Sequence, residues 1–319
     1  MHGVVADPVR EALEVLGAVA DRNVPLGPMT TYRVGGCAAV MVRATRRDDL
    51  LLVADAHRRS GLPVLAVGRG SNMLVADTGF EGIAVSTVEL PEVFAVGSAD
   101  HDGSVVVTVS AGLSLPVVAR RTAKEALTGF EWAVGVPGSI GGAVRMNAGG
   151  HGSDMAASLV DVTVIDLEAA EERVVPAAEL ELGFRSSGIP ATWLVVEARL
   201  RLAEGDRDAS ARELAEIVAW RRANQPGGQN AGSVFVNPVP GEVSAGQLID
   251  AAGLRGLRVG SAHVSEKHAN FIQAADDGTA ADVRALMRLV HDRVEAHSGW
   301  SLRSEIRLVG FDGASGDTP

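Results

Sequence analysis

Three polar side chains, each in a different part of the 319-residue chain, are candidates for chemistry. Arg185, in the segment LGFRSS, could hold a carboxylate through two parallel hydrogen bonds from its guanidinium. Ser233, in NAGSVFVNP, could deliver a proton, and Glu305, in LRSEIRLVG, stands at the head of an expected final strand. Each also has an ordinary explanation: a surface arginine, a turn serine and a charge at the rim of a domain. Spacing alone therefore favours no function for any of them.

The segment Gly129–Gly152, GFEWAVGVPGSIGGAVRMNAGGHG, is the strongest candidate for a binding site. It has neither a helical nor a strand period, and its glycines let the main chain take positive φ and approach another body closely. Consecutive N–H groups in such a backbone form a concave anion site that suits a diphosphate. Flexible linkers are polar throughout, whereas this segment carries Phe130, Trp132 and Ile140, which need a partner. We therefore expect the segment to form the wall of a cofactor pocket.

A second glycine-rich loop, GRGSN at residues 68–72, follows an expected strand. Gly-x-Gly after a strand is half of the Rossmann dinucleotide-binding fingerprint. The third glycine position is Met73, however, and the residues after it turn within a few positions instead of continuing as a helix. The loop is therefore expected to offer its amides to a phosphate without a following helix, which disfavours a Rossmann site.

Other motifs give no support for a metal site or for two common enzyme classes. His263 and His268 flank Glu266 in HVSEKH, but a five-residue gap does not place both imidazoles on one helix face, and no third ligand is evident. The sequence contains no G-x-S-x-G nucleophile elbow and no G-x-x-x-x-G-K-[ST] phosphate loop. We therefore expect no metal, and we disfavour an α/β-hydrolase and a P-loop ATPase.

Composition favours a globular chain of two or three domains. Hydrophobic residues make up 46% of the sequence, which supports a sizeable core and excludes wholesale disorder. The net charge of −11 argues against a protein that binds nucleic acid, although it permits one small anionic ligand. Cys37, the single cysteine, can form neither an intrachain disulfide nor a cysteine zinc site. The N-terminus lacks a signal-peptide pattern and no apolar run reaches the ~20 residues that span a bilayer, so we expect a cytoplasmic protein without a membrane partner.

Hydrophobic periodicity predicts a mixture of helices and strands around these segments. Expected helices cover residues 8–20, 46–60, 115–127, 176–183, 209–222, 246–252 and 279–297. Expected strands cover a short piece within 25–36, then 40–44, 62–67, 82–85, 104–109, 159–166 with 173–175 as its partner, 193–200 and 305–309. A change of composition after Gly205 places a domain boundary near residues 204–208.

Five ordered motifs together resemble the UDP-N-acetylenolpyruvoylglucosamine reductases, flavoenzymes that make UDP-N-acetylmuramate for peptidoglycan. The motifs are GRGSNMLVAD, FEWAVGVPGSIGGAVRMNAGGHG, NAGSVFVNP, AGQLIDAAGLRGLRVGSAHVSEKHANFI and LRSEIRLVG. The resemblance spans about residues 25–310 and is far more specific than any one glycine-rich loop. A different flavin oxidase or dehydrogenase would lack the motifs of the last third, and a non-catalytic nucleotide-sugar or flavin binder would have lost one of the three polar residues.

The resemblance implies an α+β flavoprotein of three domains, with a two-part FAD-binding region of the vanillyl-alcohol-oxidase (PCMH) type and a C-terminal α+β substrate domain. The implied parts are an N-terminal helix at 1–24, FAD-binding subdomains at 25–80 and 81–205, a substrate-binding domain at 206–311 and a loose tail at 312–319. The stretch between Glu181 and Ala209 leaves no room for the substrate-capping insertion of one branch, so the chain resembles the shorter type. FAD would be the cofactor, NADPH the reductant and UDP-N-acetylenolpyruvoylglucosamine the substrate of a monomeric enzyme.

The resemblance also implies roles for individual residues. Arg185 and Glu305 would stabilise the enolate that forms when the enolpyruvyl group accepts hydride, with Glu305 protonated because burial raises its pKa, and Ser233 would protonate the neighbouring carbon. Cofactor-binding residues would be Tyr32, Gly68, Gly70, Ser71, Asn72, Gly135, Pro137, Gly138, Ser139, Gly142, Ala143 and Asn147. Substrate-binding residues would be Asn237, Arg221 and Arg222.

Three positions depart from the family pattern. Phe184 replaces the usual tyrosine before the catalytic arginine, so any role of that hydroxyl is lost. Asn224 stands where a lysine is frequent, and Arg221 or Arg222 is expected to supply the charge. Arg69 stands where the flavin loop often has glycine, and it is tolerable only if its φ is negative.

Overall fold

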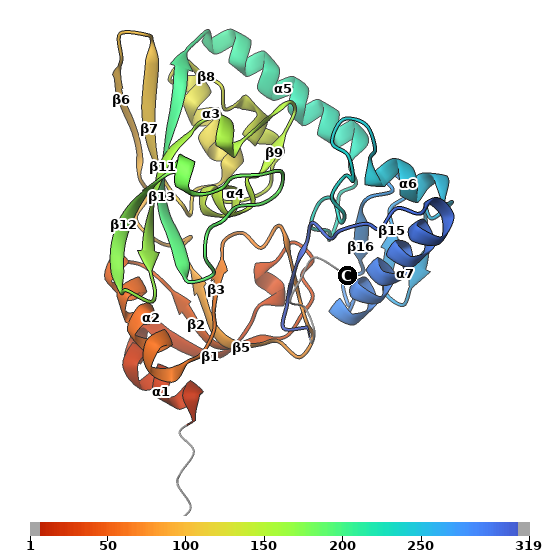
Figure 1. Ribbon diagram of the computed structural model, residues 1–319, viewed down its shortest axis with the longest axis horizontal. Coiled ribbons are helices and arrows are strands. Elements are labelled where there is room, and N and C mark those ends of the chain that lie inside the picture. Colours follow the sequence, from red (N-terminus) through yellow and green to blue (C-terminus); the bar gives the residue numbers. More distant parts are fainter. Residues whose placement is uncertain (1–6, 312–319) are drawn as a thin grey trace, which may run out of the picture. The chain divides into compact units, whose positions relative to one another are not determined.

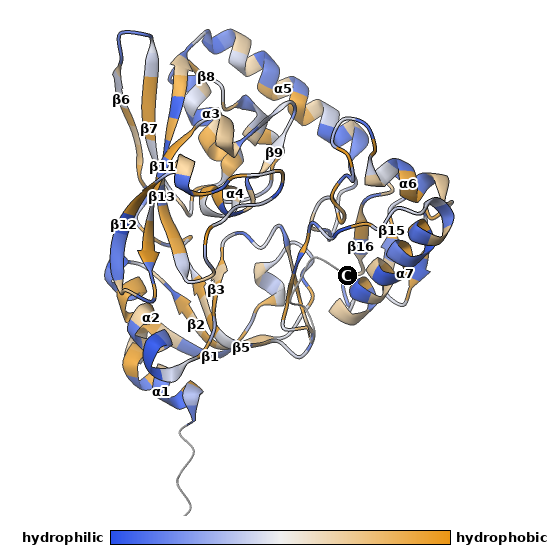
Figure 2. Ribbon diagram, viewed as in Figure 1, coloured by the Kyte–Doolittle hydropathy of each residue, from blue (hydrophilic) through white to orange (hydrophobic). Residues whose placement is uncertain are grey.

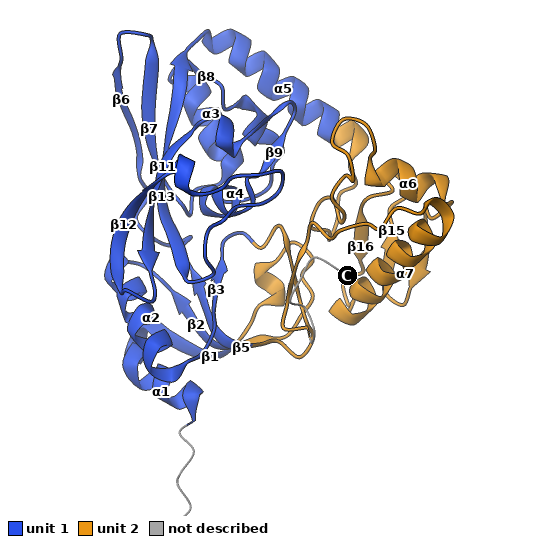
Figure 3. Cartoon of the chain, viewed as in Figure 1, with its two compact units in different colours: residues 1–23, 39–69, 81–221 blue, residues 24–38, 70–80, 222–319 orange. Residues whose placement is uncertain are grey.

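The structure of the chain is a computed structural model that describes residues 7–311. The fold divides into two compact units (Figure 3). Unit 1 holds residues 1–23, 39–69 and 81–221, and unit 2 holds residues 24–38, 70–80 and 222–319. The chain therefore passes from one unit to the other five times, so neither unit is one continuous segment.

A four-stranded sheet in the order β1-β2-β5-β3, most of it in unit 1, packs with two helices (Figure 1). The elements are α1 (Pro8–Leu16), β1 (Ala20–Pro25), β2 (Cys37–Arg43), α2 (Arg47–Ser60), β3 (Val64–Val67) and β5 (Phe80–Ser86). Strands β3 and β5 are parallel. Helix α2 buries Leu50 and Val53 in one core with Val40 and Val85 of the sheet, whereas Leu51 is exposed.

The larger sheet of unit 1 is antiparallel and has the order β12-β11-β13-β7-β6, with the short strand β8 beside β13. Its strands are β6 (Phe94–Ala99), β7 (Ser104–Ser110), β8 (Leu127–Thr128), β11 (Leu159–Asp166), β12 (Glu171–Pro176) and β13 (Trp193–Glu204). The helical elements that share its core are α3 (Leu115–Lys124), the 3₁₀ turn η3 (Glu131–Gly135), α4 (Ile140–Met146) and α5 (Arg207–Asn224). In Figure 2, strands β7 and β13 are largely hydrophobic, whereas α5 is mostly hydrophilic, as expected for an exposed helix. The expected pairing of residues 159–166 with 173–175 is confirmed.

Unit 2 has its own core between two helices and two small sheets. Its elements are the 3₁₀ turn η2 (Gly27–Met29), β4 (Met73–Val75), α6 (Ala245–Ala251), β14 (Arg258–Val259), β15 (Ala262–Val264), β16 (Ile272–Ala274), α7 (Ala280–Ser298) and β17 (Arg307–Val309). Helix α7 buries one apolar stripe, which includes Val283, Leu286 and Val290. Strands β4 and β17 pair in parallel, so that Met73 lies beside Arg307, which is far away in the sequence.

Two expected helices end earlier than predicted because the next residues take positive φ. The helix expected at 8–20 ends at Leu16, since Gly17 has a φ of 55°. The helix expected at 115–127 ends at Lys124, and Ala126 has a φ of 56°. A residue in the left-handed region cannot continue a right-handed helix.

In three further segments, the structure has a different type of secondary structure from the one expected. Residues 25–36 contain the turn Gly27–Met29 rather than a strand, and residues 176–183 contain only a 3₁₀ turn at Ala177–Glu179. The glycine-rich segment was expected to lack a helix, but it contains α4. Ser139 caps the start of α4 by accepting a hydrogen bond from the Gly142 amide, and Asn147 ends it in the left-handed conformation. These end residues define a seven-residue helix that is too short and too glycine-rich to show a period.

The division into three domains remains a prediction. The unit boundary in this region falls between Arg221 and Arg222, near the end of α5, whereas the composition changes before α5 begins. The first six residues of the expected N-terminal part and the expected loose tail at 312–319 lie outside the described residues.

Candidate active site

The loop of residues 68–72 presents its backbone as an anion-binding surface. Gly70 has a φ of 57°, and a Cβ atom there would lie 2.2 Å from the Met29 carbonyl oxygen. Only glycine fits such a position. Arg69 is not among the residues with positive φ, so the condition for tolerating an arginine here is met. The backbone N–H groups of residues 68–72 donate no hydrogen bond to another described residue of the same unit. Consecutive amides of this kind can cradle a phosphate.

The two glycine-rich segments meet in unit 1. A Cβ atom on Gly68 would lie 2.4 Å from the Ser139 Oγ atom, so the absence of a side chain at Gly68 permits this close approach. The backbone after Ser139 is held by the protein itself, because the Ile140 amide donates to Leu113 and the Gly141 amide to Ala111, both at 2.9 Å. The structure therefore brings a fixed segment against a loop whose amides are unused.

The other predicted cofactor residues occupy several environments. Tyr32 is fully buried in the core of unit 2, and its hydroxyl has no hydrogen-bond partner among the described residues. Burial raises the pKa of that hydroxyl, so it stays neutral. Ala143 is buried in α4, whereas Gly135 closes η3 and packs against α5. The unused amides of residues 68–72 and the close approach that Gly68 allows to Ser139 fit a phosphate-bearing cofactor such as FAD.

Asn147 uses its side chain inside the protein. Its Nδ2 atom donates to the Gly183 carbonyl oxygen at 2.9 Å and to Asp154 at 3.2 Å, and its Oδ1 atom accepts from the Ala156 amide at 2.9 Å. Asn147 has a φ of 39° and is buried. It therefore joins the end of α4 to the turn that carries Arg185.

Arg185 is held in an unusual backbone conformation. Its φ is 56°, and it lies in a turn closed by a bridge between Gly183 and Ser186. The Nη2 atom donates to the Gly149 carbonyl oxygen at 2.7 Å, and the guanidinium carbon lies 5.2 Å from the Phe184 ring centroid. Positive φ in a residue with a side chain is uncommon and is found more often at functional sites. The arginine thus sits against the glycine-rich segment.

Ser233 and Glu305 come from neighbouring segments of unit 2. The Glu305 amide donates to the Val234 carbonyl oxygen at 2.8 Å, and Phe235 forms a bridge with Ser304. The Asn72 side chain donates to the Glu305 carbonyl oxygen at 3.0 Å. The structure therefore brings the backbones of three predicted site residues together within unit 2. Arg185 belongs to unit 1.

The predicted substrate residues are divided between the units. Arg221 belongs to unit 1, and Arg222 and Asn237 belong to unit 2. The Asn237 Oδ1 atom accepts from the Ala245 amide at 3.0 Å, at the first residue of α6. The Arg222 carbonyl oxygen accepts from Lys267 at 2.5 Å.

Sequence reasoning missed two residues that shape these segments. Asn270 both donates to and accepts from the backbone of Phe235, two residues after Ser233. His151 packs beside Arg221, as the contacts of Gly135 show. The only local signal for His151 was its place before a glycine in GGHG, which is typical of a turn.

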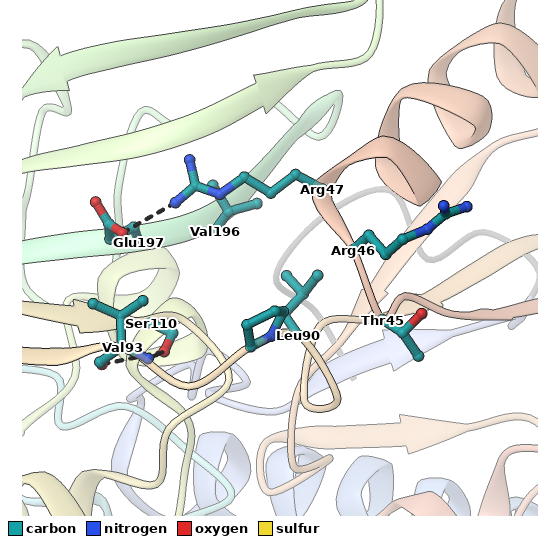
Figure 4. A pocket seen from close by; sticks show the side chains of 9 residues that line it. Thr45, Arg46, Arg47, Leu90, Val93, Ser110, Val196 and Glu197 are labelled. Carbon is teal, nitrogen blue, oxygen red and sulfur yellow. Dashed lines mark hydrogen bonds and ion pairs between the residues drawn. The ribbon is translucent and has the colours of Figure 1, made fainter.

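A cavity of about 310 Å³ lies elsewhere in unit 1 and contains none of the predicted site residues (Figure 4). It is lined by Thr45, Arg46, Arg47, Leu90, Pro91, Val93, Ser110, Val196 and Glu197. Its arginines already have carboxylate partners: Arg47 pairs with Glu172 and Glu197, and Arg46 pairs with Asp49. The cavity offers no unpaired charge for a ligand.

Between residues 7 and 311, no group of three or more His, Cys, Asp or Glu side chains is placed to hold a metal ion. None of the helices in that range combines the length and hydropathy that crossing a membrane requires.

Known proteins resemble the chain over nearly its whole length. Residues 38–173 match the FAD binding domain family, and residues 223–309 match the C-terminal domain of UDP-N-acetylenolpyruvoylglucosamine reductase. The reductase of Gloeobacter violaceus is 42% identical over 293 residues, which cover 90% of this chain and 95% of that protein. The reductase of Heliobacterium modesticaldum is 40% identical and covers 92% and 91%, respectively. The crystal structure of the Thermus caldophilus reductase superposes with a TM-score of 0.74 at 33% identity, covering 91% of this chain and 98% of that one.

Proposed function

Because the chain belongs to the UDP-N-acetylenolpyruvoylglucosamine reductase family, we propose that it reduces UDP-N-acetylenolpyruvoylglucosamine to UDP-N-acetylmuramate with NADPH. Its membership makes it a flavoprotein oxidoreductase of peptidoglycan precursor synthesis, with FAD as cofactor. The observation that carries the proposal is that one chain holds the FAD binding domain and the reductase C-terminal domain in this order, together with Arg185, Ser233 and Glu305.

The loop of residues 68–72 and the segment around Ser139 would hold the cofactor. The unused amides of that loop suit its diphosphate, and the glycines allow close approach. FAD, when bound, supplies hydride to the enolpyruvyl group after NADPH has reduced it. The residues of the chain then have to orient the substrate and stabilise the charge that develops on it.

Arg185 and Glu305 would stabilise that charge. The substrate is an enol ether conjugated to a carboxylate, so adding hydride builds negative charge on the carboxylate as an enolate. A donor placed at developing charge can contribute about 3–4 kcal/mol to catalysis. The bond from Arg185 to the Gly149 carbonyl oxygen limits the freedom of its guanidinium, which favours such a role. Glu305 would have to be protonated to donate a hydrogen bond.

Ser233 would deliver the proton that completes the reaction and sets the stereocentre. A serine hydroxyl is a weak acid in water, so this step requires direct contact with a strongly basic carbanion. The pairing of the segments that carry Ser233 and Glu305 supports their acting on one ligand. Asn237, Arg221 and Arg222 would bind the nucleotide diphosphate.

The proposal also covers the location, the oligomeric state, the domain organisation and the length type of the enzyme. The enzyme would be a cytoplasmic monomer, and its FAD-binding region would form two subdomains beside the substrate domain. It would be the shorter type, since only residues 180–192 lie between η5 and β13, too few for an extra substrate-capping domain. The 98% coverage of the Thermus caldophilus chain supports a similar length.

Replacing Ser233 tests the assignment by separating the two half-reactions. In Ser233→Ala, anaerobic NADPH should still bleach the flavin, whereas recovery of its colour with UDP-N-acetylenolpyruvoylglucosamine should slow by at least ~100-fold, because a general acid is lost. The absorbance of the flavin at its visible maximum follows both steps.

Three results would contradict the proposal in different ways. A wild-type protein that bleaches but never recovers its colour with the substrate has a different electron acceptor. A protein that takes up no added FAD contradicts the cofactor assignment. If Ser233→Ala recovers as fast as the wild type, Ser233 is not the proton donor.

A further inference from the structure

Glu305 is held through its main chain by two other segments of unit 2. Its amide donates to the Val234 carbonyl oxygen at 2.8 Å, directly after Ser233. Its carbonyl oxygen accepts from the Nδ2 atom of Asn72 at 3.0 Å. The main chain of Glu305 therefore connects the segment of the predicted proton donor to the loop of residues 68–72.

The hydrogen bond from Asn72 to Glu305 stands where a backbone bond would be expected. Strands β4 and β17 are parallel, with Met73 beside Arg307, and the Arg307 amide donates to the Asn72 carbonyl oxygen at 3.0 Å. In a regular parallel ladder, the residue that accepts this bond donates its own amide to the carbonyl two positions earlier on the facing strand. That carbonyl belongs to Glu305, and it is bonded by the Asn72 side chain instead.

The loop is also held from its other side. The Thr31 amide donates to the Gly70 carbonyl oxygen at 3.1 Å. Because a trans peptide directs its carbonyl and its N–H to opposite sides, the Ser71 amide points away from Thr31. The amides of Gly70, Ser71 and Asn72 have no acceptor among the described residues of unit 2, and adjacent amides of this kind can bind an anion.

We propose that Asn72 is a positioning residue for Glu305, because its side chain makes the hydrogen bond that its own amide would make in a regular ladder. This exchange fixes the main chain of Glu305 and leaves the Asn72 amide available to a phosphate of the cofactor. The inference rests on the proposed function, in which Glu305 stabilises the enolate and residues 68–72 hold FAD. It assigns the Asn72 side chain to Glu305 and only the Asn72 main chain to the cofactor.

The two half-reactions of the FAD-loaded protein, followed by stopped-flow absorbance, test this assignment. The measured quantity is the rate of flavin reoxidation by UDP-N-acetylenolpyruvoylglucosamine divided by the rate of flavin reduction by NADPH. Asn72→Ala should lower this ratio about tenfold to hundredfold, because a donor displaced from the developing charge slows only reoxidation. The reoxidation rate at saturating substrate should fall, while the half-saturating substrate concentration changes little, since the enolate forms only in the transition state.

A matched control separates positioning from a general loss of stability. Thr279→Ala removes the side-chain cap of α7, which is also in unit 2 and makes no contact with Glu305 through that cap. It should destabilise the protein but leave the ratio of the two rates at the wild-type value. A ratio that falls equally in Asn72→Ala and Thr279→Ala would show that Asn72 only stabilises the fold.

Asn72→Asp provides a second test within one protein, and it also serves if Asn72→Ala does not fold. The variant keeps the shape of the side chain but turns the donor into a carboxylate, which repels the Glu305 carbonyl oxygen. Protonation restores an O–H donor, and the bond it makes raises the pKa of the new carboxyl above its usual value of about 3.9. Glu305 and Arg307, the charged residues of the facing segment, are the same in the wild type.

The reoxidation rate of Asn72→Asp, divided by the wild-type rate at the same pH, should therefore rise as the pH falls from about 8 to about 5. The same quotient for Asn72→Ala should stay flat, because alanine has no group to protonate. Flat quotients for both variants would overturn the proposal.

Two further outcomes identify what has failed. If Asn72→Ala binds FAD more weakly but is reoxidised at the wild-type rate once loaded, the side chain is a flavin ligand and the proposal is wrong. If the reduced wild-type protein is not reoxidised by the substrate at all, the proposed function is wrong, and this inference falls with it. Equal ratios in an active wild type and in Asn72→Ala contradict the inference alone.

Discussion

At the scale of single residues, two kinds of constraint act at Gly70. Its φ of 57° disfavours any side chain, and its surroundings leave no space for a Cβ atom. Gly17 has nearly the same φ, 55°, but nothing lies within 4 Å of the position of its Cβ atom. The comparison of these two glycines separates backbone strain from collision.

Gly70→Ala should therefore destabilise the protein more than Gly17→Ala. Positive φ strains an alanine at either position by about 1–3 kcal/mol, and the collision with the Met29 carbonyl oxygen adds to this cost only at Gly70. Urea unfolding measures the difference, and the flavin content of the purified protein should fall only in Gly70→Ala. Equal unfolding midpoints for the two variants would show that the loop moves away without cost.

At the scale of elements, the sequence predicted every α-helix of the described residues except α4, but it missed several strands, among them β1, β4 and β6, and how the glycine-rich segment is held. Both glycine-rich loops were identifiable from composition, whereas their contact through Gly68 and Ser139 depends on tertiary structure. The caps of α4 act over a few residues, but the partners of Asn147 reach as far as Gly183. Local periodicity carries no information about such distant partners.

Asn147→Gly should loosen the turn that carries Arg185. Glycine keeps the positive φ, but the Gly183 carbonyl and the Ala156 amide lose their partner, at a cost of about 1–3 kcal/mol each. Flavin reduction by NADPH should persist while its reoxidation by substrate slows. Asn23→Gly is a matched control, because Asn23 also has positive φ but is exposed. Equal reoxidation rates in the two variants would show that Asn147 does not position Arg185.

The start of α2 predicts a measurable dependence of stability on pH. Burial would raise the pKa of Asp49, but hydrogen bonds from Thr45 and Arg46 outweigh it and hold the pKa below its usual value. Asp49 therefore stabilises the fold above the pKa of the unfolded chain, about 3.9, and loses this contribution as pH falls through the lower folded value.

Asp49→Asn should accordingly lose stability at neutral pH, and the difference from the wild type should shrink in acid. Free energies of unfolding at several pH values measure it, with the neighbouring exposed Asp48 replaced in the control Asp48→Asn. A difference that is constant from neutral pH to about pH 3 would show that the charge of Asp49 is not what stabilises α2.

At the scale of the whole molecule, the sequence predicted the class of fold and the order of its parts. It did not predict that each compact unit is built from several separate segments of the chain. A boundary read from composition assumes that each domain is one continuous stretch. Residues 24–38 and 70–80 lie in the same compact unit as the C-terminal third, and Tyr32 and Leu74 lie in the same core as Phe235 and Ile306. Pairings this distant leave no local pattern in the chain.

The parallel pairing of β4 with β17 has a consequence for the order of events during synthesis. Asn72 and Glu305, which border these strands, are 233 residues apart, so the partner of β4 is synthesised long after β4 itself. Domains generally fold as they emerge, N-terminal parts first. Strand β4 must instead wait, unpaired, until β17 has been synthesised. The loop of residues 68–72, which leads into β4, would therefore reach its final form only after β17 has joined it, and FAD would be captured long after both glycine-rich segments have been synthesised.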